Sequence, residues 1–180
     1  MDTNNLVRRF KEQFGHTGDL YFSPGRINLI GEHTDYNGGF VMPGAIDKGI
    51  SVCITPNGSK EVRLIAVDLS TDNTVSFNLD ASAKPAPHWS HYIYGVCMEM
   101  IRHGIEVSGF DAAFSGDVPR GGGMSSSAAL ECSFAFALND IFGNNRIDKF
   151  ELAKIGQTAE REYSGVNCGI MDQFSSVFGK

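Results

Sequence analysis

The chain has 180 residues, a formal net charge of −6 and 42% hydrophobic residues, with 13 phenylalanines among them. This length suits one domain, or one domain and part of another, and the apolar content argues against disorder. The acidic balance argues against a nucleic-acid surface, because phosphate backbones select basic stripes.

No stretch approaches the roughly 18 uninterrupted apolar residues of a membrane helix, and the first residues lack the layout of a signal peptide. The four cysteines, which lie far apart with no CxxC pair, argue against zinc and against a compact disulfide framework. We therefore predict a cytoplasmic protein with no membrane contact, whose thiols are reduced core residues. They are Cys53, Cys97, Cys132 and Cys168.

The first element expected is a helix, because Leu6, Phe10 and Phe14 recur at helical spacing. Asp2 and Thr3 are candidate caps, and Gly15 is a stop signal. Strands follow from Asp19 to about Leu79. Within that range, β-branched residues predict strands at 50–54 and 62–67, and two further segments, 37–39 and 56–58, predict turns.

Helical patterns dominate the rest of the chain. One amphipathic helix is expected near 89–101, a strand at 110–118 ended by Pro119, and a helix at 128–142 that is apolar on nearly every face. A third helical pattern runs from Leu152 to Tyr163. Strands first and helices later, with one strand between, predict an α+β fold instead of alternating βαβ units.

A glycine–serine run separates the strand at 110–118 from the buried helix. Gly121, Gly122 and Gly123 would let backbone N–H groups approach an anion, and the helix start at Ser125 adds a partial positive charge. Hydroxyls of the following serines could donate to phosphate or ligate Mg²⁺. The run contains neither GKS/GKT nor GxGxxG. An ordinary strand–helix connection with serine caps is the alternative, and spacing alone leaves both open.

A second loop, near the start of the chain, collects polar side chains. Arg26 opens a short apolar run, and Glu32, His33 and Asp35 follow it. Carboxylates accept hydrogen bonds from sugar hydroxyls and histidine can donate or accept one, so the cluster suits a polyol pocket. His33 and Asp35 could bind a metal ion, but no second histidine nearby in the sequence supports a metal site.

Two isolated polar positions complete the candidates. His88 and His91 are three residues apart, but no third ligand accompanies them, so we expect solvated helix positions instead of a metal site. Asp172 lies in the otherwise apolar stretch 168–174. It can be a helix N-cap or a general base toward a hydroxyl, and its position in the sequence does not choose between them.

Three motifs carry a family resemblance. Residues 24–39 resemble the galactokinase signature almost residue for residue, and residues 118–131 resemble the second motif of the GHMP kinases. Residues 168–173 are similar to the galactokinase segment that bears the catalytic aspartate. The resemblance implies the N-terminal domain of a GHMP kinase over residues 1–180, a mixed sheet packed with helices like domain 2 of ribosomal protein S5.

The resemblance also implies a reaction, in which ATP phosphorylates α-D-galactose at its C1 hydroxyl with Mg²⁺ as cofactor. Asp172 would be the base and Arg26 its partner, which stabilises the phosphoryl group. The sugar would contact Arg26, Glu32, His33, Asp35, Gly169 and Asp172. ATP would contact Gly121, Gly122, Gly123, Met124, Ser125, Ser126 and Ser127. The metal ligands would be Ser127 and Glu160.

The chain departs from the family pattern at Arg120 and at Met124, where leucine is usual, and neither change alters the amide cradle. The family continues past Lys180 with a second domain, so we expect a fragment that is weakly active or inactive. Two alternatives stay open. One is a kinase for N-acetylgalactosamine or a related sugar, and the other is a sugar sensor that engages a regulatory partner.

Overall fold

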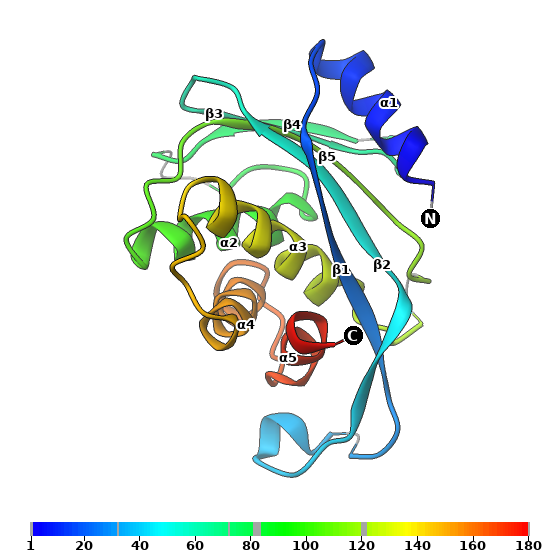
Figure 1. Cartoon of the computed structure of the whole chain (residues 1–180). Helices are drawn as coiled ribbons and strands as arrows, with labels where there is room; N and C mark the ends of the chain where they lie inside the picture. The colour runs from blue at the N-terminus through cyan, green and yellow to red at the C-terminus, as the bar shows by residue number, and fades with distance from the viewer. Residues whose placement is uncertain (1, 32, 72, 81–83, 120–121, 180) are drawn as a thin grey trace.

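The computed structural model describes residues 2–31, 33–71, 73–80, 84–119 and 122–179 (Figure 1). Within these ranges, five strands form one sheet in the order β1-β2-β5-β3-β4. The strands are β1 (Asp19–Asn28), β2 (Pro43–Pro56), β3 (Glu61–Ala66), β4 (Thr74–Asn78) and β5 (Phe110–Gly116). Each neighbouring pair is antiparallel except β3 and β5, which are parallel. The sheet is therefore mixed.

Helices cover both faces of this sheet unequally. On one face, α3 lies against the sheet among the other helices of that layer, while α1 packs alone on the opposite face (Figure 1). The helices are α1 (Thr3–Phe14), α2 (Ser90–Arg102), α3 (Ser126–Ile141), α4 (Lys149–Thr158) and α5 (Met171–Phe178). The short helical segments are η1 (Asp35–Asn37) and η2 (Ala159–Tyr163). The α+β architecture expected from the sequence is confirmed.

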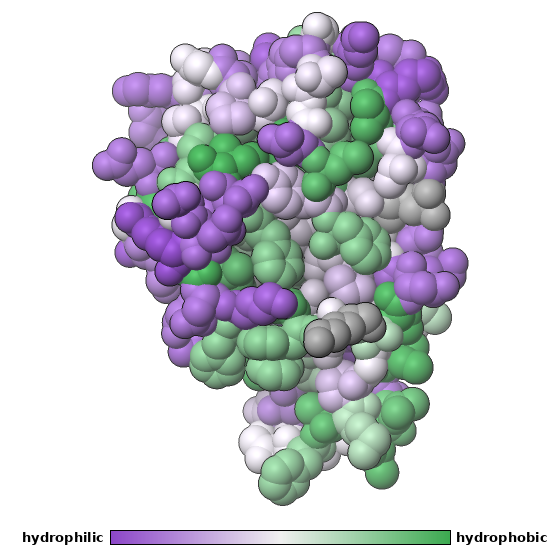
Figure 2. Space-filling model, viewed as in Figure 1, coloured by the Kyte–Doolittle hydropathy of each residue, from purple (hydrophilic) through white to green (hydrophobic). Residues whose placement is uncertain are grey.

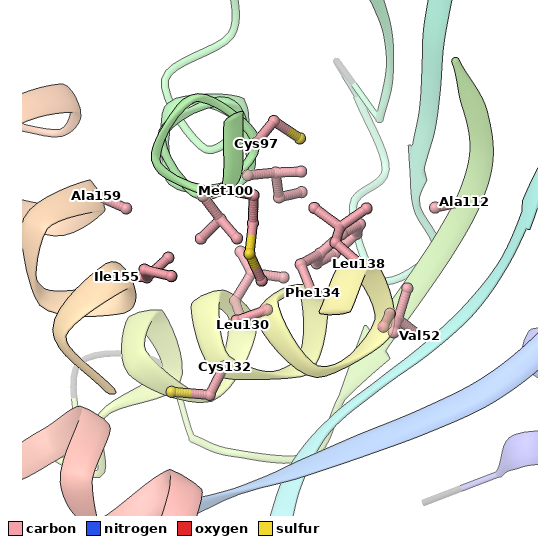
Figure 3. Close-up of a cluster of buried hydrophobic side chains, with 14 of the residues drawn as sticks. Val52, Cys97, Met100, Ala112, Leu130, Cys132, Phe134, Leu138, Ile155 and Ala159 are labelled. Carbon is pink, nitrogen blue, oxygen red and sulfur yellow. The ribbon is translucent and has the colours of Figure 1, made fainter. Parts of the chain in front are cut away.

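Side-chain alternation along the strands explains the two layers. Val52 and Ile54 point into the large core under α2 to α5, whereas Cys53 between them points to the small cluster under α1. Figure 3 shows Phe134 and Leu138 of α3 at the centre of the large core, between the sheet and α2. Both side chains are fully buried, which is why the sequence of α3 is apolar on nearly every face.

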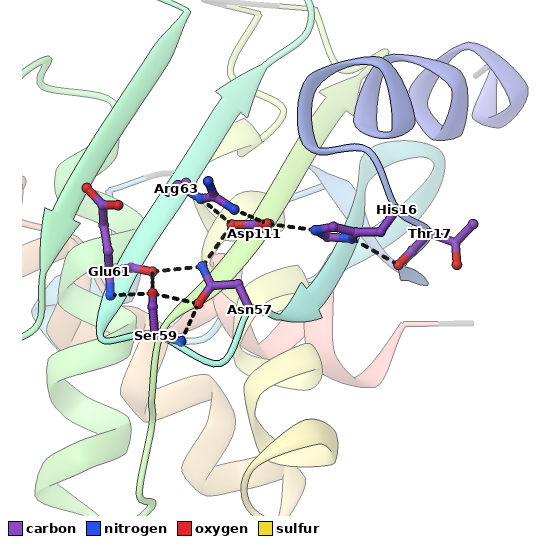
Figure 4. Close-up of polar contacts among 7 residues, drawn as sticks. All are labelled: His16, Thr17, Asn57, Ser59, Glu61, Arg63 and Asp111. Atoms are coloured by element: carbon purple, nitrogen blue, oxygen red, sulfur yellow. Dashed lines mark hydrogen bonds and ion pairs between the residues drawn. The ribbon is translucent and has the colours of Figure 1, made fainter.

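The caps of α1 match the sequence prediction. Asp2 accepts a hydrogen bond from the Asn5 amide at 3.0 Å, and Gly15 ends the helix with φ of 81°. Beyond that helix, His16 reaches Asp111, a fully buried carboxylate in β5 (Figure 4). Arg63 and Asn57 also bind this carboxylate, so the polar cluster joins the end of α1 to two strands.

Several element boundaries differ from the prediction. The strand before Pro119 ends at Gly116, and the strands at 50–54 and 62–67 are separated in the sheet by β5. The third helical pattern is not one α-helix, because α4 ends at Thr158 and a five-residue π-helix follows. At the other end of the chain, α5 ends at Phe178 with Gly179 at its C-cap.

The two histidines expected at solvated helix positions differ, because His88 is exposed whereas His91 is half-buried with its ring hydrogen-bonded to the Pro85 carbonyl at 2.8 Å. His88 precedes α2 instead of lying on it, and its ring is 4.8 Å from that of His91. No cluster of three potential metal-ligating His, Cys, Asp or Glu side chains occurs in the described part of the chain. All four cysteines are free; three are buried and Cys168 is half-buried. No helix among the described residues is both long enough and apolar enough to cross a bilayer.

Candidate active site

The centre of the candidate site is an ion pair between distant parts of the chain. Arg26, near the end of β1, donates from Nε to Asp172 Oδ1 at 2.7 Å, and its Nη2 forms an ion pair with the same oxygen at 2.6 Å. Their side chains are 12% and 20% exposed, so the pair opens to solvent on one side. Asp172 is the second residue of α5, whose N-cap position is Ile170, so the N-cap interpretation of Asp172 is wrong. Its carboxylate is left available to the site.

The glycine–serine loop closes around this pair. Arg26 also donates to the carbonyl of Gly123, and the hydroxyl of Ser125 donates to Asp172 Oδ2. The Arg26 amide bonds to the Met124 carbonyl at 3.2 Å, which fixes the loop against β1. The pairing of β1 with β2 shifts register between Pro24 and Arg26, and such irregularities re-aim side chains beside active sites.

The backbone of the loop has a conformation suited to presenting amides. Gly123 has φ of 65° and Ser125 has φ of 56°, a left-handed conformation that is uncommon for a residue other than glycine. Helix α3 begins directly afterward at Ser126, and the first N–H groups of a helix have no intrahelical partner. Gly122 lies in the same turn, while Gly121 falls outside the described residues. The first N–H groups of α3 are therefore left without intrahelical partners, whereas the Gly122 amide bonds the Pro119 carbonyl at 3.3 Å.

A second junction ties the loop between β1 and β2, residues 29–42 and called the signature loop below, to the entrance of α5. Asp35 Oδ2 accepts a hydrogen bond from the Met171 amide at 3.0 Å, and its carboxylate lies against Gly169. His33 has φ of 63°, and its ring hydrogen-bonds Tyr36 instead of joining that contact. Glu32 lies outside the described residues. Asp35, Gly169 and the Arg26–Asp172 pair thus meet at one end of α5.

A third junction links the first turn of α3 to the π-helix η2. Ser127 Oγ donates to Glu160 Oε1 at 2.7 Å, so the two predicted metal ligands are in contact. Hard oxygen donors suit Mg²⁺, which commonly uses one or two protein ligands together with phosphate oxygens and water. The hydroxyl and carboxylate therefore fit a magnesium ion beside the loop.

Buried polar residues behind Glu160 were missed by the sequence reasoning. Gln173 donates from Nε2 to Glu160 Oε2 at 2.6 Å and to Glu131 Oε2 at 2.9 Å. Burial, together with the nearby charge of Glu160, raises the pKa of the Glu131 carboxyl well above its usual range, while the hydrogen bond from Gln173 opposes this. Ser127 and Glu131 are four residues apart on α3, a spacing that puts both on one face. That spacing was the only signal available in the sequence.

An apolar pocket of about 550 Å³ opens next to the first turn of α3. Ser126 and Ser127 form its polar edge, and Trp89 and Phe114 provide aromatic surface with ring centroids 5.4 Å apart. Asp68 lies at the same pocket. The sequence reasoning treated Trp89 only as part of an amphipathic helix, because the wall residues come from separate elements.

Apolar side chains are also exposed around the signature loop. Figure 2 shows hydrophobic surface at the lower end of the molecule, where the loop between β1 and β2 lies in Figure 1. Leu29, Ile30, Phe40 and Met42 are each more than half exposed. The candidate site lies beside this surface, because Asp35 belongs to the same loop.

Comparison with known proteins identifies the class. Residues 91–180 match the N-terminal domain of GHMP kinases, and residues 8–56 match the galactokinase galactose-binding signature. The chain belongs to the GHMP kinase family and comprises its N-terminal domain. The mevalonate kinase of Methanococcus jannaschii shares this fold at 23% identity, with a TM-score of 0.72 over 91% of this chain and 52% of that one.

Within the family, the similar proteins include several galactokinases at about 40% identity. The galactokinase of Clostridium tetani is 43% identical over all of this chain and 46% of its own length. The crystal structure of Lactococcus lactis galactokinase complexed with galactose superimposes with a TM-score of 0.92 and 38% identity, over all of this chain and 47% of that one. The chain thus spans a little under half the length of these relatives.

Proposed function

We propose that the protein containing this chain is a galactokinase, which transfers the γ-phosphoryl group of ATP to the C1 hydroxyl of α-D-galactose. The observation that carries the proposal is the Asp172 carboxylate, which is held by Arg26 and Ser125 between an amide-presenting loop and the signature loop. A phosphoryl acceptor needs its hydroxyl aligned beside a base, with cations and N–H donors around the transferred group. The Asp172 carboxylate, the Arg26 guanidinium beside it and the N–H groups at the start of α3 support the proposal.

In the proposed reaction, Asp172 accepts the proton of the sugar C1 hydroxyl while the oxygen attacks the γ-phosphorus. The bond from that phosphorus to the β–γ bridging oxygen breaks, so the products are galactose 1-phosphate and ADP. Arg26 orients Asp172 and stabilises the negative charge on the transferred group. His33, Asp35 and Gly169, together with Glu32, hold the other sugar hydroxyls.

The phosphates of ATP are proposed to lie on the loop of Gly122, Gly123, Met124 and Ser125, which Gly121 extends. The N–H groups at the start of α3, from Ser126 and Ser127, complete the cradle. The adenine ring of ATP then fits the apolar pocket beside Trp89, because a flat ring can stack there while the phosphates reach the loop. Mg²⁺ held by Ser127 and Glu160 would neutralise phosphate charge.

The relatives are about twice as long as this chain, and we propose that their second half contributes to the same site. The 180-residue chain alone is then expected to bind both substrates weakly and to turn over slowly or not at all. The exposed apolar surface beside Asp35 supports this, since large exposed apolar patches commonly mark interaction surfaces.

The proposal is tested with the 180-residue chain and with the product of its complete reading frame. Calorimetry measures binding of galactose and N-acetylgalactosamine, and ³¹P NMR identifies the phosphorylated product. Galactose 1-phosphate formation supports the proposal, whereas sugar binding without ADP release from the complete product contradicts it and favours a sensor.

A substitution of the proposed base sharpens this test. Asp172→Asn is expected to keep galactose binding while turnover falls by about 10²- to 10⁴-fold, the usual contribution of a general base. Asp140→Asn, an exposed substitution at the far end of α3, is the control and is expected to leave turnover unchanged. Near-normal turnover by Asp172→Asn with sugar bound would show that Asp172 is not the base.

A further inference from the structure

Gln173 and Asp172 are adjacent in the first turn of α5 but face different surroundings. Successive helical residues point about 100° apart. Asp172 is 20% exposed and faces Arg26 and Ser125, whereas Gln173 is fully buried. The site described above uses Asp172 and assigns nothing to Gln173.

The amide of Gln173 binds two carboxyl groups at once. Its Nε2 lies 2.6 Å from Glu160 Oε2 and 2.9 Å from Glu131 Oε2, so both of its N–H donors are used. Glu131 comes from α3 and Glu160 from the π-helix η2, and both are buried. One side chain on α5 therefore links the two elements that carry the predicted metal ligands.

Glu160 is consequently held at both of its oxygens. Oε1 accepts from Ser127 at 2.7 Å while Oε2 accepts from Gln173, which prevents the carboxylate from rotating. The Gln173 side chain is itself confined, because a Cβ added at Gly156 of α4 would be only 3.0 Å from its Cγ. The amide therefore sets the direction in which Glu160 faces Ser127.

The buried cluster of Gln173, Glu131 and Glu160 does not maximise the stability of the fold. Among the described residues, Glu131 Oε1 and Gln173 Oε1 are buried with no hydrogen-bond partner, and an unpaired buried polar atom is destabilising. Replacing buried charged or polar groups with apolar residues of similar size is often neutral or stabilising. Local departures of this kind are expected at functional sites.

We propose that Gln173 is a positioning residue that holds the Glu160 carboxylate toward Ser127. It thereby sets the affinity of the glycine–serine loop for magnesium-bound ATP. This inference rests on the proposed function, since it presupposes that Ser127 and Glu160 face a metal ion beside bound phosphates. It assigns to Gln173 no contact with either substrate.

The test is Gln173→Met, which preserves side-chain length but removes both N–H donors. Calorimetry on the 180-residue chain measures ATP affinity with Mg²⁺ and, separately, with EDTA. The unaltered chain should gain affinity with Mg²⁺. In the variant, the increase in ATP affinity caused by Mg²⁺ should be about 10- to 100-fold smaller, as expected when the support of a metal ligand is removed. An increase smaller than this should be lost completely. The variant's metal-free ATP affinity should stay within about twofold, because the amide loop is untouched.

Two further variants separate positioning from general destabilisation. Asn139→Leu removes another buried amide, on α3, which binds the backbone of Ile147. It should lower the melting temperature without changing the Mg²⁺ gain. Gln173→Asn, one methylene too short to bridge both acids, should also reduce the gain and serves as the test if the methionine variant does not fold.

A double variant checks that Gln173 acts through Glu160. Glu160→Gln should lose the Mg²⁺ gain, and adding Gln173→Met should cause no further loss, since residues acting as one unit are not additive. An unchanged gain in the folded Gln173 variants overturns the inference, and so does an unaltered chain that binds ATP with no Mg²⁺ gain. Failure of the unaltered chain to bind ATP under either condition overturns this inference, whereas the proposed function is judged separately, by product formation from the complete protein.

Discussion

Gly169 lies so close to Asp35 that a side chain at position 169 has no room. A Cβ there would be 1.9 Å from Asp35 Oδ2 and 2.0 Å from its Cγ, far inside any tolerated contact. The same Oδ2 accepts the hydrogen bond of the Met171 amide. The signature loop and the entrance to α5 therefore hold each other in place, and glycine is required for that contact.

Gly169→Ala should displace Asp35 and weaken galactose binding. Because inserting a methyl group into a packed site costs about 1–3 kcal/mol, galactose affinity should fall about tenfold or more. ATP affinity should be unchanged. Calorimetric titration with each substrate measures this. Gly44→Ala is the matched control, since a Cβ at Gly44 meets no atom within 4 Å. Equal galactose affinity in both variants would show that Asp35 does not face the sugar.

Trp89 should report nucleotide binding directly, because it is the only tryptophan in the chain and lines the apolar pocket. ATP should shift or quench its fluorescence, and galactose should not. Trp89→Leu should weaken ATP binding by about 1–3 kcal/mol, the usual value of stacking a base on an aromatic ring. Trp89→Phe keeps a flat ring and should retain most of the affinity. Identical ATP affinity in the leucine variant would place the base elsewhere.

Glu131 should make stability fall as pH rises. Burial raises the pKa of its carboxyl, so the folded chain favours the protonated form. Its stabilising contribution is complete below about pH 4.3, the ordinary glutamate pKa, and is lost as pH rises toward the folded value. Glu131→Gln, which is neutral throughout, should therefore gain stability relative to the unaltered chain between pH 5 and pH 8. Urea unfolding at several pH values measures the difference, and parallel curves would contradict this assignment.

The contribution of Asp111 to the stability of the fold should have the opposite dependence on pH. Burial alone would raise the pKa of its carboxyl, but hydrogen bonds from Arg63, Asn57 and His16 outweigh burial and lower it. Its contribution is therefore present above about pH 3.9, the ordinary aspartate pKa, and is lost as pH falls through the lower folded value. Asp111→Asn should cost about 2 kcal/mol at pH 7, the range for hydrogen bonds to a charged group. Acid unfolding below pH 4 should then be less steep, and unchanged steepness would exclude this role.

Local signals explain what the sequence predicted well. The caps of α1, the buried helix α3 and the two loops are determined by neighbouring residues, so composition and spacing predict them. The assembled site was only partly accessible. The Arg26–Asp172 pair followed from family resemblance, because nothing local relates residues so far apart. Gln173 lies inside the family-like segment 168–173, but the sequence assigns it no role, since its contacts are with carboxyl groups from two other elements. The pocket at Trp89 was missed for the same reason.

The π-helix shows a further limit of periodicity. Its apolar positions continue the pattern of α4, so the sequence predicts one longer α-helix. The wider turn places the Ser164 amide against the Ala159 carbonyl, five residues back, at 3.3 Å. The spacing of apolar side chains does not indicate which backbone carbonyl accepts the hydrogen bond of a given amide.

The partnership of Arg26 with Asp172 also bears on when the protein becomes competent during synthesis. Arg26 leaves the ribosome early, yet its carboxylate partner follows 146 positions later, at the start of α5. Until α5 docks against β1, Arg26 and Ser125 lack the carboxylate that both of them bind. Nascent chains that end before α5 therefore carry the first two sequence motifs without a working arrangement of charges. Pairings between residues so distant in sequence also form slowly.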